Sequence, residues 1–142
     1  MTFFVVVKSY HDVHIALAPV LYQGEDWQKD LIEVVIGGYG NTRSFIRRGN
    51  QGTELCKAET PNILSGEEFR GFWITTKPLE DKGLEINFGL IGQTTPLMVG
   101  IDPDPVPFQF LGLASWANAE AFYRNVRTGI LLRYSSSKHQ TY

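Results

Sequence analysis

The stretch Glu33–Arg48, EVVIGGYGNTRSFIRR, decides the fold. An apolar run leads into three glycines in four positions, which is how many nucleotide and S-adenosylmethionine sites begin. Such sites need a helix directly after the glycines, because the helix N-terminus supplies the aligned N–H groups that hold the ligand. Here residues 42–48 alternate with a period of two, which predicts a strand instead. We therefore interpret the glycines, together with Asn41, as a tight turn in which the backbone takes positive φ.

The rest of the chain repeats this pattern of short strands and turns. Runs rich in Val, Ile, Phe, Trp and Thr alternate with the turn clusters GGYGN, RGNQG, EDKG and DPDPVP. This spacing predicts an all-β fold, an antiparallel β-sandwich of jelly-roll type with about ten strands. Only residues 118–126, NAEAFYRNV, have a helical pattern, so we expect at most one short helix. The predicted strands are residues 2–8, 13–17, 31–36, 43–48, 54–58, 70–76, 84–90, 97–101, 107–115 and 130–134.

Length and charge narrow the possible functions. The 142 residues predict one domain, residues 3–134, followed by a polar tail at 135–142. The 13 basic and 15 acidic residues are scattered along the chain, which argues against a nucleic-acid partner.

The N-terminal segment and the single cysteine exclude further classes. The apolar run in the opening MTFFVVVK is too short to span a membrane and lacks the basic start of a signal peptide, so we expect no membrane insertion. The single Cys56 excludes an intrachain disulfide; we expect a buried thiol, with an intermolecular disulfide as the alternative.

Four motifs in order along the chain resemble one known family. They are HDVHIAL at 11–17, EVVIGGYGNTRSFIRR at 33–48, ILSGEEFRGFWI at 63–74 and VPFQFLGLASW at 106–116. The pattern is similar to the domain named after farnesoic acid O-methyltransferase over residues 3–117, although family members usually have tryptophan where Tyr39 stands. The resemblance implies a module of extracellular and innate-immune animal proteins, and so binding rather than catalysis. A free-standing copy is similar in kind to small invertebrate lectins.

Asp12 and His14 are the first candidate ligand-binding residues. Val13, Ile15 and Leu17 share one face of the predicted strand, so Asp12 and His14 project together from the other face. A carboxylate beside an imidazole can bind sugar hydroxyls, or His14 can bind a metal. A structural hydrogen bond between Asp12 and His14, fixing the edge of the strand, is the alternative.

Arg43 and Arg47 are a second candidate pair. They share one face of the strand that follows the glycine turn, and arginine forks suit hydroxyls, carboxylates and sulfates. Surface ion pairs with the many glutamates are the alternative interpretation.

The aromatic residues divide into two groups. Trp73 and Trp116 lie in apolar runs and are predicted to be core residues. Trp27 lies in the polar segment QGEDWQKD, and Tyr39 lies with Asn41 at the tip of the glycine turn. Exposed rings of this kind can stack on sugars or anchor a protein interface, or they can pack on their own domain.

Metal binding has little support in the sequence. Asp102 and Asp104 stand two apart in IDPDPVP, a spacing that calcium could use, but a rigid inter-strand loop explains it better. Three histidines, His11, His14 and His139, are too few and too scattered for a histidine-based metal site.

These observations predict a non-catalytic carbohydrate-binding protein. We expect galactose-type or related sugars as ligands and Asp12, His14, Trp27, Tyr39, Asn41, Arg43 and Arg47 as candidate site residues. Single sugar sites are weak, so useful avidity requires several sites and we expect a homo-oligomer. The family context favours an extracellular location. The alternatives are a methyltransferase acting on a farnesoic-acid-like substrate, which needs a donor pocket, and a protein-interaction module.

Overall fold

The computed structural model describes residues 1–20, 30–49, 52–116, 118–128 and 133–135. The elements in chain order are β1 (Thr2–Lys8), β2 (Val13–Ala18), β3 (Ile32–Gly37), α1 (Gly38–Asn41), β4 (Arg43–Arg48), β5 (Thr53–Glu59), β6 (Arg70–Pro78), β7 (Leu84–Leu90), β8 (Met98–Asp102), β9 (Phe110–Ser115), β10 (Phe122–Thr128) and β11 (Arg133–Ser135). The predicted tail begins within β11, and residues 136–142 lie outside the described part.

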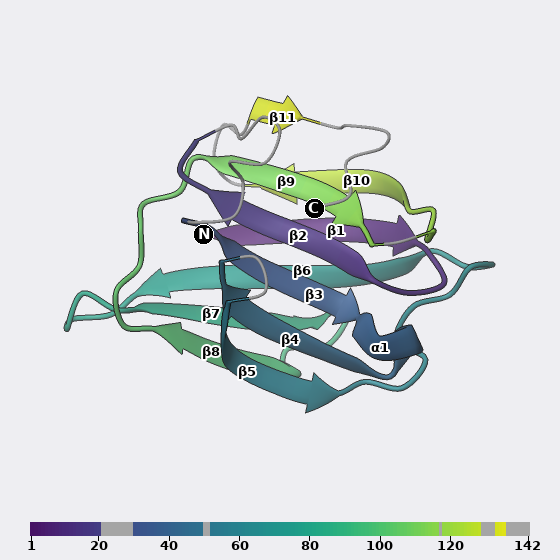
Figure 1. Ribbon diagram of the computed structural model, residues 1–142, viewed down its shortest axis with the longest axis horizontal. Coiled ribbons are helices and arrows are strands. Elements are labelled where there is room, and N and C mark those ends of the chain that lie inside the picture. The colour runs from purple at the N-terminus through teal and green to yellow at the C-terminus, as the bar shows by residue number, and fades with distance from the viewer. Residues whose placement is uncertain (21–29, 50–51, 117, 129–132, 136–142) are drawn as a thin grey trace.

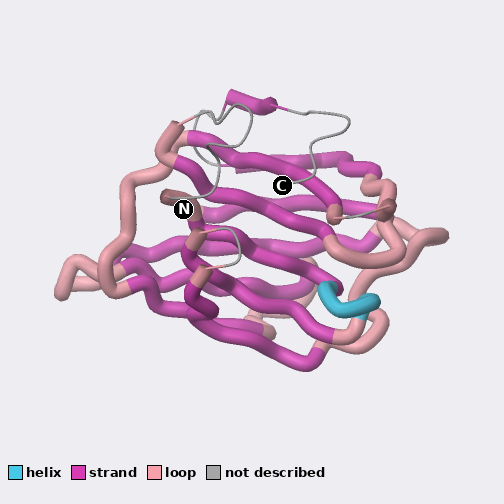
Figure 2. The backbone as a smooth tube through the Cα atoms, viewed as in Figure 1, coloured by secondary structure: helices cyan, strands magenta, loops and turns pink. Residues whose placement is uncertain are grey.

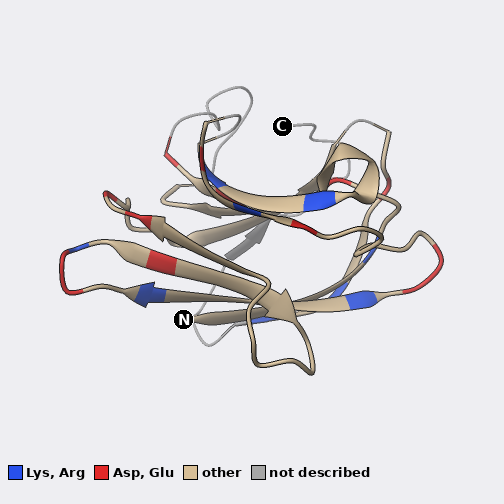
Figure 3. Cartoon of the chain, turned by 90° about the horizontal axis from the view of Figure 1, so that it is seen from below, with Lys and Arg blue, Asp and Glu red and all other residues tan. Residues whose placement is uncertain are grey.

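The strands form two sheets that pack face to face. One sheet has five strands in the order β10-β1-β6-β7-β8, and the other has six in the order β11-β9-β2-β3-β4-β5. All pairs are antiparallel except β11 with β9. The six-stranded sheet faces the viewer in Figure 1, and Figure 3 shows the two layers edge-on. This architecture confirms the predicted all-β sandwich.

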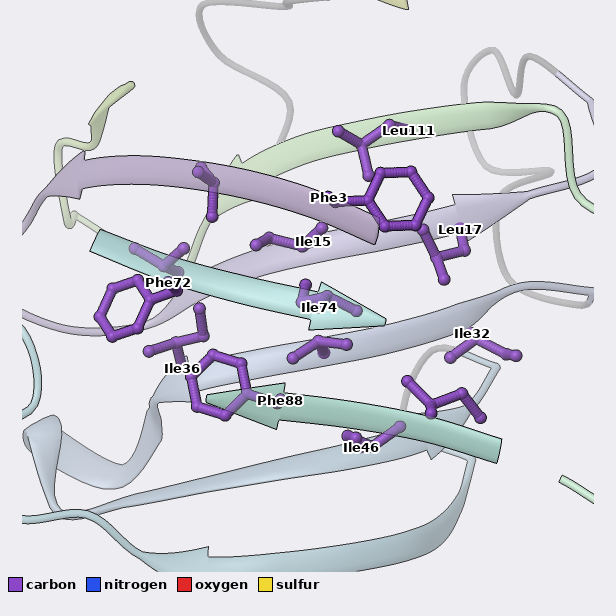
Figure 4. Close-up of a cluster of buried hydrophobic side chains, with 14 of the residues drawn as sticks. Phe3, Ile15, Leu17, Ile32, Ile36, Ile46, Phe72, Ile74, Phe88 and Leu111 are labelled. Carbon is purple, nitrogen blue, oxygen red and sulfur yellow. The ribbon is translucent and has the colours of Figure 1, made fainter. Parts of the chain in front are cut away.

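The core lies between the sheets because each strand alternates its side chains. In β1 the buried residues are Phe3, Val5 and Val7, and in β6 they include Phe72 and Ile74. The Phe72 and Phe88 rings stack with centroids 5.5 Å apart. Figure 4 shows Phe3, Phe72 and Phe88 of the five-stranded sheet and Ile15 and Ile36 of the six-stranded sheet pointing into one layer. Burial of each large apolar side chain in such a layer contributes about 1.5–3 kcal/mol.

The predicted helix at residues 118–126 is wrong, and a bulge explains the error. Residues 122–128 form β10, which pairs antiparallel with β1. Between Arg124 and Arg127 the register shifts, and Asn125 takes φ 52°. One extra residue is thereby inserted, so Tyr123 and Val126 both pack on the core although they stand three apart. Core-facing residues three positions apart are typical of a helix, and here the bulge produces the same spacing in a strand.

The two tryptophans predicted to be core residues are not in the core. Trp73 alternates with buried Phe72 and Ile74 in β6 and is half-buried on the outer face of the five-stranded sheet. Trp116 follows the end of β9 and is 38% exposed. The apolar runs did predict strands correctly, but a period of two sends every second residue outward.

Cys56 lies in β5 and is half-buried rather than fully buried. Desolvation by burial raises the pKa of its thiol, which keeps it protonated and unreactive at neutral pH. Among the described residues, no helix is long and apolar enough to cross a membrane.

Candidate functional site

The candidate site lies on the outer face of the six-stranded sheet, where strand register aligns side chains in rows. His14 of β2 is opposite Val35 of β3, and Val35 is opposite Phe45 of β4. In the adjacent row, Glu33 is opposite Arg47. Side chains at paired and diagonal positions are within reach of one another. The alternation of Arg43, Phe45 and Arg47 against inward Ser44 and Ile46 is therefore confirmed.

These rows form the floor of a pocket of about 420 Å³, which we call the aromatic pocket. It is lined by Asp12, His14, Val35, Tyr39, Phe45, Arg47 and Trp116. Val35 and Phe45 are buried beneath it, whereas Tyr39 is 67% exposed and Trp116 is 38% exposed. An apolar floor with exposed rings and a few polar groups is typical of small-molecule sites.

A buried charged cluster fixes two of the polar groups. Glu33 is 1% exposed, and its Oε1 lies 2.5 Å from Nδ1 of His14. Its Oε2 accepts a hydrogen bond from Nε of Arg47, also at 2.5 Å. One carboxylate thus holds an imidazole and a guanidinium in fixed orientations, with both groups lining the pocket.

The charge state of Glu33 follows from this environment. Burial alone raises the pKa of the carboxyl, but the hydrogen bonds and charges of His14 and Arg47 outweigh burial and hold the pKa below its ordinary value. Glu33 is therefore a carboxylate at neutral pH, and it balances the charge of Arg47.

Aromatic contacts build the walls of the pocket. The Trp116 ring stacks on His14 with centroids 6.3 Å apart and an interplanar angle of 30°. The ring centroids of Tyr39 and Phe45 are 6.0 Å apart. The Arg43 guanidinium stands over the Tyr39 ring, with Cζ 4.6 Å from the ring centroid. These contacts set the rings at defined angles around the polar groups.

The glycine turn places Tyr39. Gly37, Tyr39, Gly40 and Asn41 all have positive φ, at 64°, 53°, 69° and 65°, so the short element α1 is a left-handed turn at the end of β3. Figure 2 shows it as the single cyan segment. The tight-turn interpretation is confirmed at Gly37, Gly40 and Asn41, whereas Gly38 does not have the expected positive φ. Sequence reasoning did not anticipate the same conformation at Tyr39, where it costs about 1–2 kcal/mol.

Backbone hydrogen bonds of Asp12 join the parts of the pocket. Its N–H donates to the carbonyl of Gly37 at 3.0 Å, and its carbonyl accepts from the N–H of Trp116 at 3.0 Å. Asp12 itself has φ 51°, a conformation that aspartate tolerates better than most residues. The start of β2, the glycine turn and the end of β9 are thereby held together.

The structure brings together four of the predicted site residues: Asp12, His14, Tyr39 and Arg47. Arg43 is not among the lining residues: its guanidinium stands over the Tyr39 ring, and its Nε lies 4.0 Å from Oε1 of Glu59. Trp27 lies outside the described residues.

Asn41 has a structural role, which replaces our expectation of a ligand-facing amide. Its Nδ2 donates to the carbonyl of Leu64 at 2.9 Å, and its Oδ1 accepts from the N–H of Leu64 at 3.0 Å. Both polar ends of the side chain are therefore used to anchor the turn to residues 60–64.

The predicted alternative of an Asp12–His14 hydrogen bond is also corrected. His14 binds Glu33, and Asp12 instead accepts from Nδ1 of His11 at 2.7 Å. Nor is β2 an edge strand, since it lies between β9 and β3. Asp12 and His14 line the same pocket, but each has its own partner.

Sequence reasoning missed Glu33 and misplaced Trp116. A charged residue inside the apolar run LIEVVIG is the signal that could have found Glu33, because a carboxylate is buried there only with partners. Its two partners, His14 and Arg47, were among the candidate residues, but pairing them with Glu33 required the strand order. Trp116 directly follows the last strand residue, Ser115, where the chain can turn outward.

The acidic pair at the end of β8 is an ion-pair cluster. Asp102 is buried and lies 3.6 Å from Nη1 of Arg48, and exposed Asp104 lies 3.7 Å from the same atom. Asp102 Oδ1 also accepts from the N–H of Asp104 at 3.1 Å, which fits a rigid loop. Within the described ranges, no group of three metal-ligating side chains is placed to hold an ion.

The comparisons with known proteins identify the family. The sequence pattern described as farnesoic acid O-methyl transferase matches residues 1–127, so the chain belongs to this family. No curated protein and no solved structure matches the chain.

Proposed function

We propose that this member of the farnesoic acid O-methyl transferase family is a non-catalytic, lectin-like module whose aromatic pocket binds a neutral, galactose-type sugar. The observation that carries the proposal is the combination of two exposed ring walls, Trp116 and Tyr39, with fixed polar groups between them. Sugars present both an apolar C–H face and hydroxyl groups, and this pocket offers a surface for each.

The polar groups suit hydroxyls. Asp12 uses Oδ2 for His11 and lines the pocket, where its carboxylate can accept a hydrogen bond from a hydroxyl group. Arg47 binds Glu33 through Nε and lines the pocket, and a guanidinium is a hydrogen-bond donor to hydroxyl groups. An acceptor beside a donor can bind two neighbouring hydroxyls at once.

The charge of the pocket favours a neutral ligand. The positive charge of Arg47 is balanced at hydrogen-bond distance by Glu33, and Asp12 adds a negative charge to the pocket wall. An anionic sugar would be repelled by that carboxylate. We therefore propose neutral sugars, rather than sialylated or sulfated sugars, as the ligands of this pocket.

The pocket is held in shape before a ligand arrives. A tyrosine with positive φ persists only where the surrounding structure holds it, and such residues cluster at functional sites. Here Thr42 Oγ1 donates to the carbonyl of Tyr39 at 2.9 Å, and Arg43 covers the ring. A rigid site loses less conformational entropy on binding, which supports affinity for a small ligand.

Methyl transfer has less support than binding, despite the family name. A methyl-donor site of the kind first considered needs a helix N-terminus after the glycines. The glycines are followed by one left-handed turn and then by β4. Among the described residues that line the pocket, Tyr39 alone belongs to α1, and its backbone there is left-handed rather than helical. We therefore infer that the domain in this chain binds its ligand without catalysis.

A glycan array and one titration test this proposal. We expect binding to terminal galactose-type glycans, loss of that binding in Asp12→Asn and Trp116→Ala, and no heat from S-adenosylmethionine in calorimetry. Glu59→Gln is the matched control, because Glu59 lies on the same sheet outside the pocket and is exposed. Measurable S-adenosylmethionine affinity without glycan binding would overturn the proposal in favour of a methyltransferase.

A further inference from the structure

Three cations lie in a row on the outer face of the five-stranded sheet, along the pair of strands β1 and β10. The residues of β1 alternate between the core and the outer face, and Lys8 is on the outer face. Strand register places Arg124 and Arg127 of β10 opposite two further outward residues of β1, Val6 and Phe4. We call Lys8, Arg124 and Arg127 the basic strip. Figure 1 shows β10 and β1 side by side behind the six-stranded sheet.

The bulge in β10 brings the two arginines to the same face. In a regular strand, residues three positions apart point to opposite faces. The register shift at Asn125 changes this, so Arg124 and Arg127 both point outward while Tyr123 and Val126 both pack on the core. Bulges are frequent where a strand re-aims a side chain for function.

Two phenylalanine rings orient the cations of the basic strip. Nζ of Lys8 lies 5.2 Å from the ring centroid of Phe69 and 5.3 Å from that of Phe122. Cζ of Arg124 lies 3.8 Å from the same Phe69 centroid. Lys8 and Arg124 therefore meet at one ring, although like charges repel. Two cations held this close can both bind one anionic group.

No described carboxylate forms an ion pair with the basic strip. The two acidic residues just before β6 have other partners. Glu68 Oε2 lies 3.2 Å from Nη2 of Arg70, and Glu67 Oε1 accepts a hydrogen bond from the Tyr10 hydroxyl at 3.0 Å. Glu120 is exposed and precedes β10. The basic strip is thus a local concentration of positive charge on a chain whose formal net charge is −2.

We propose that the basic strip binds a linear sulfated polysaccharide. Successive outward residues of a strand are about 6.8 Å apart, so the three cations span about 14 Å. A row of this length suits a chain that carries repeated anionic groups, and both guanidinium and ammonium groups bind such oxyanions. The basic strip is separate from the aromatic pocket, which lies on the other sheet, and the proposal does not rest on sugar binding there.

Other polyanions fit the basic strip less well. An anionic membrane would meet the whole face, where Glu85 of β7 stands opposite Lys77 of β6 and cancels its charge. Nucleic-acid binders are usually basic proteins, unlike a chain with a net charge of −2. An acidic peptide added to the edge of β10 would need a regular ladder, which the bulge at Asn125 interrupts.

Immobilised heparin, a linear sulfated polysaccharide, tests the proposal at neutral pH and about 50 mM NaCl. We expect the wild type to bind and the double variant Lys8→Gln, Arg124→Gln to lose affinity at least about tenfold, with a weaker dependence on salt, because each lost cation releases fewer counterions. Arg127→Gln should also weaken binding, and Arg127 has no ring contact in the described part of the chain, so its removal leaves the packing intact.

Lys77→Gln is the matched control. It removes the same charge from the outer face of the same sheet, but Lys77 stands opposite Glu85 and outside the basic strip. Its affinity for heparin should stay within about twofold of the wild type. Near-ultraviolet circular dichroism shows whether each variant is folded.

The proposal is overturned by a wild type that does not bind heparin, by folded strip variants that bind as well as the wild type, or by an equal loss in Lys77→Gln. Equal or tighter binding to phosphatidylserine vesicles or to single-stranded DNA would overturn the choice of a polysaccharide. Lactose titrations of the same variants keep the two sites apart, because a failure of sugar binding in the aromatic pocket would leave the heparin result unchanged.

Discussion

Glu33 Oε1 lies 2.5 Å from Nδ1 of His14, and both side chains are buried beneath the aromatic pocket. With Arg47 on its other oxygen, Glu33 turns an otherwise apolar sheet surface into a surface with oriented polar groups. We infer that Glu33 positions residues that line the pocket, since Glu33 itself is buried.

Removal of the Glu33 charge tests whether this buried cluster also stabilises the fold. Glu33→Gln leaves Arg47 without its buried counter-charge, so we expect the free energy of unfolding to fall by about 3 kcal/mol in urea denaturation. Glu59→Gln removes an exposed carboxylate 4.0 Å from Arg43 and should cost under about 0.5 kcal/mol. Equal, small losses in the two variants would show that the buried cluster does not stabilise the fold.

The lowered pKa of Glu33 predicts a pH dependence of stability. Its folded pKa lies below the ordinary 4.5, so its contribution is fully present above about pH 4.5. That contribution is lost as the pH falls through the lowered folded pKa, because the unfolded state binds the proton more readily. Denaturation midpoints between pH 3 and pH 6 should fall more steeply on acidification in the wild type than in Glu33→Gln; parallel curves would refute the assignment.

Alanine substitutions at two glycines of the turn distinguish the energetic cost of backbone strain from that of steric crowding. Gly37 and Gly40 have nearly the same positive φ, but a Cβ at Gly37 would lie 2.6 Å from Cδ1 of Leu64, whereas one at Gly40 meets nothing within 4 Å. We expect Gly40→Ala to cost about 1 kcal/mol and Gly37→Ala at least about 2 kcal/mol in thermal or urea unfolding. The reverse order would mean that the turn differs from the one described.

We expect the Tyr39 side chain to contribute more to ligand affinity than to the stability of the fold. Tyr39→Gly relieves the strain of its positive φ but removes the contacts with Phe45 and Arg43, so the free energy of unfolding should change by less than about 1 kcal/mol. Glycan affinity should nevertheless fall severalfold, because one ring wall is lost. A variant that is equally stable and binds equally well would remove Tyr39 from the site.

The fold could be predicted from the sequence because most strands obey a strict alternation. The bounds of β1, β4 and β7 agree with the predicted runs at both ends, since turn residues mark those ends. The run at residues 118–126 failed where the bulge at Asn125 broke the alternation. Local spacing alone does not reveal a bulge, because the partner strand β1 determines which residue is left unpaired.

The site was predictable only in part. Asp12, His14, Tyr39 and Arg47 could be selected by residue type and face, and they do line one pocket. Glu33 and Trp116 could not, because their roles depend on strand order: β3 lies between β2 and β4, and β9 lies beside β2. These pairings bring together residues that stand up to about a hundred positions apart, and single-strand patterns carry no information about them.

The most direct test of the central claim is chemical-shift mapping of lactose on the ¹⁵N-labelled protein. We expect saturable shifts at millimolar sugar for the backbone amides of Asp12 and Tyr39 and for the indole N–H of Trp116, with the amides around Val99 unchanged. Saturable shifts confined to other surfaces, or none at all in the folded protein, would contradict sugar binding in the aromatic pocket.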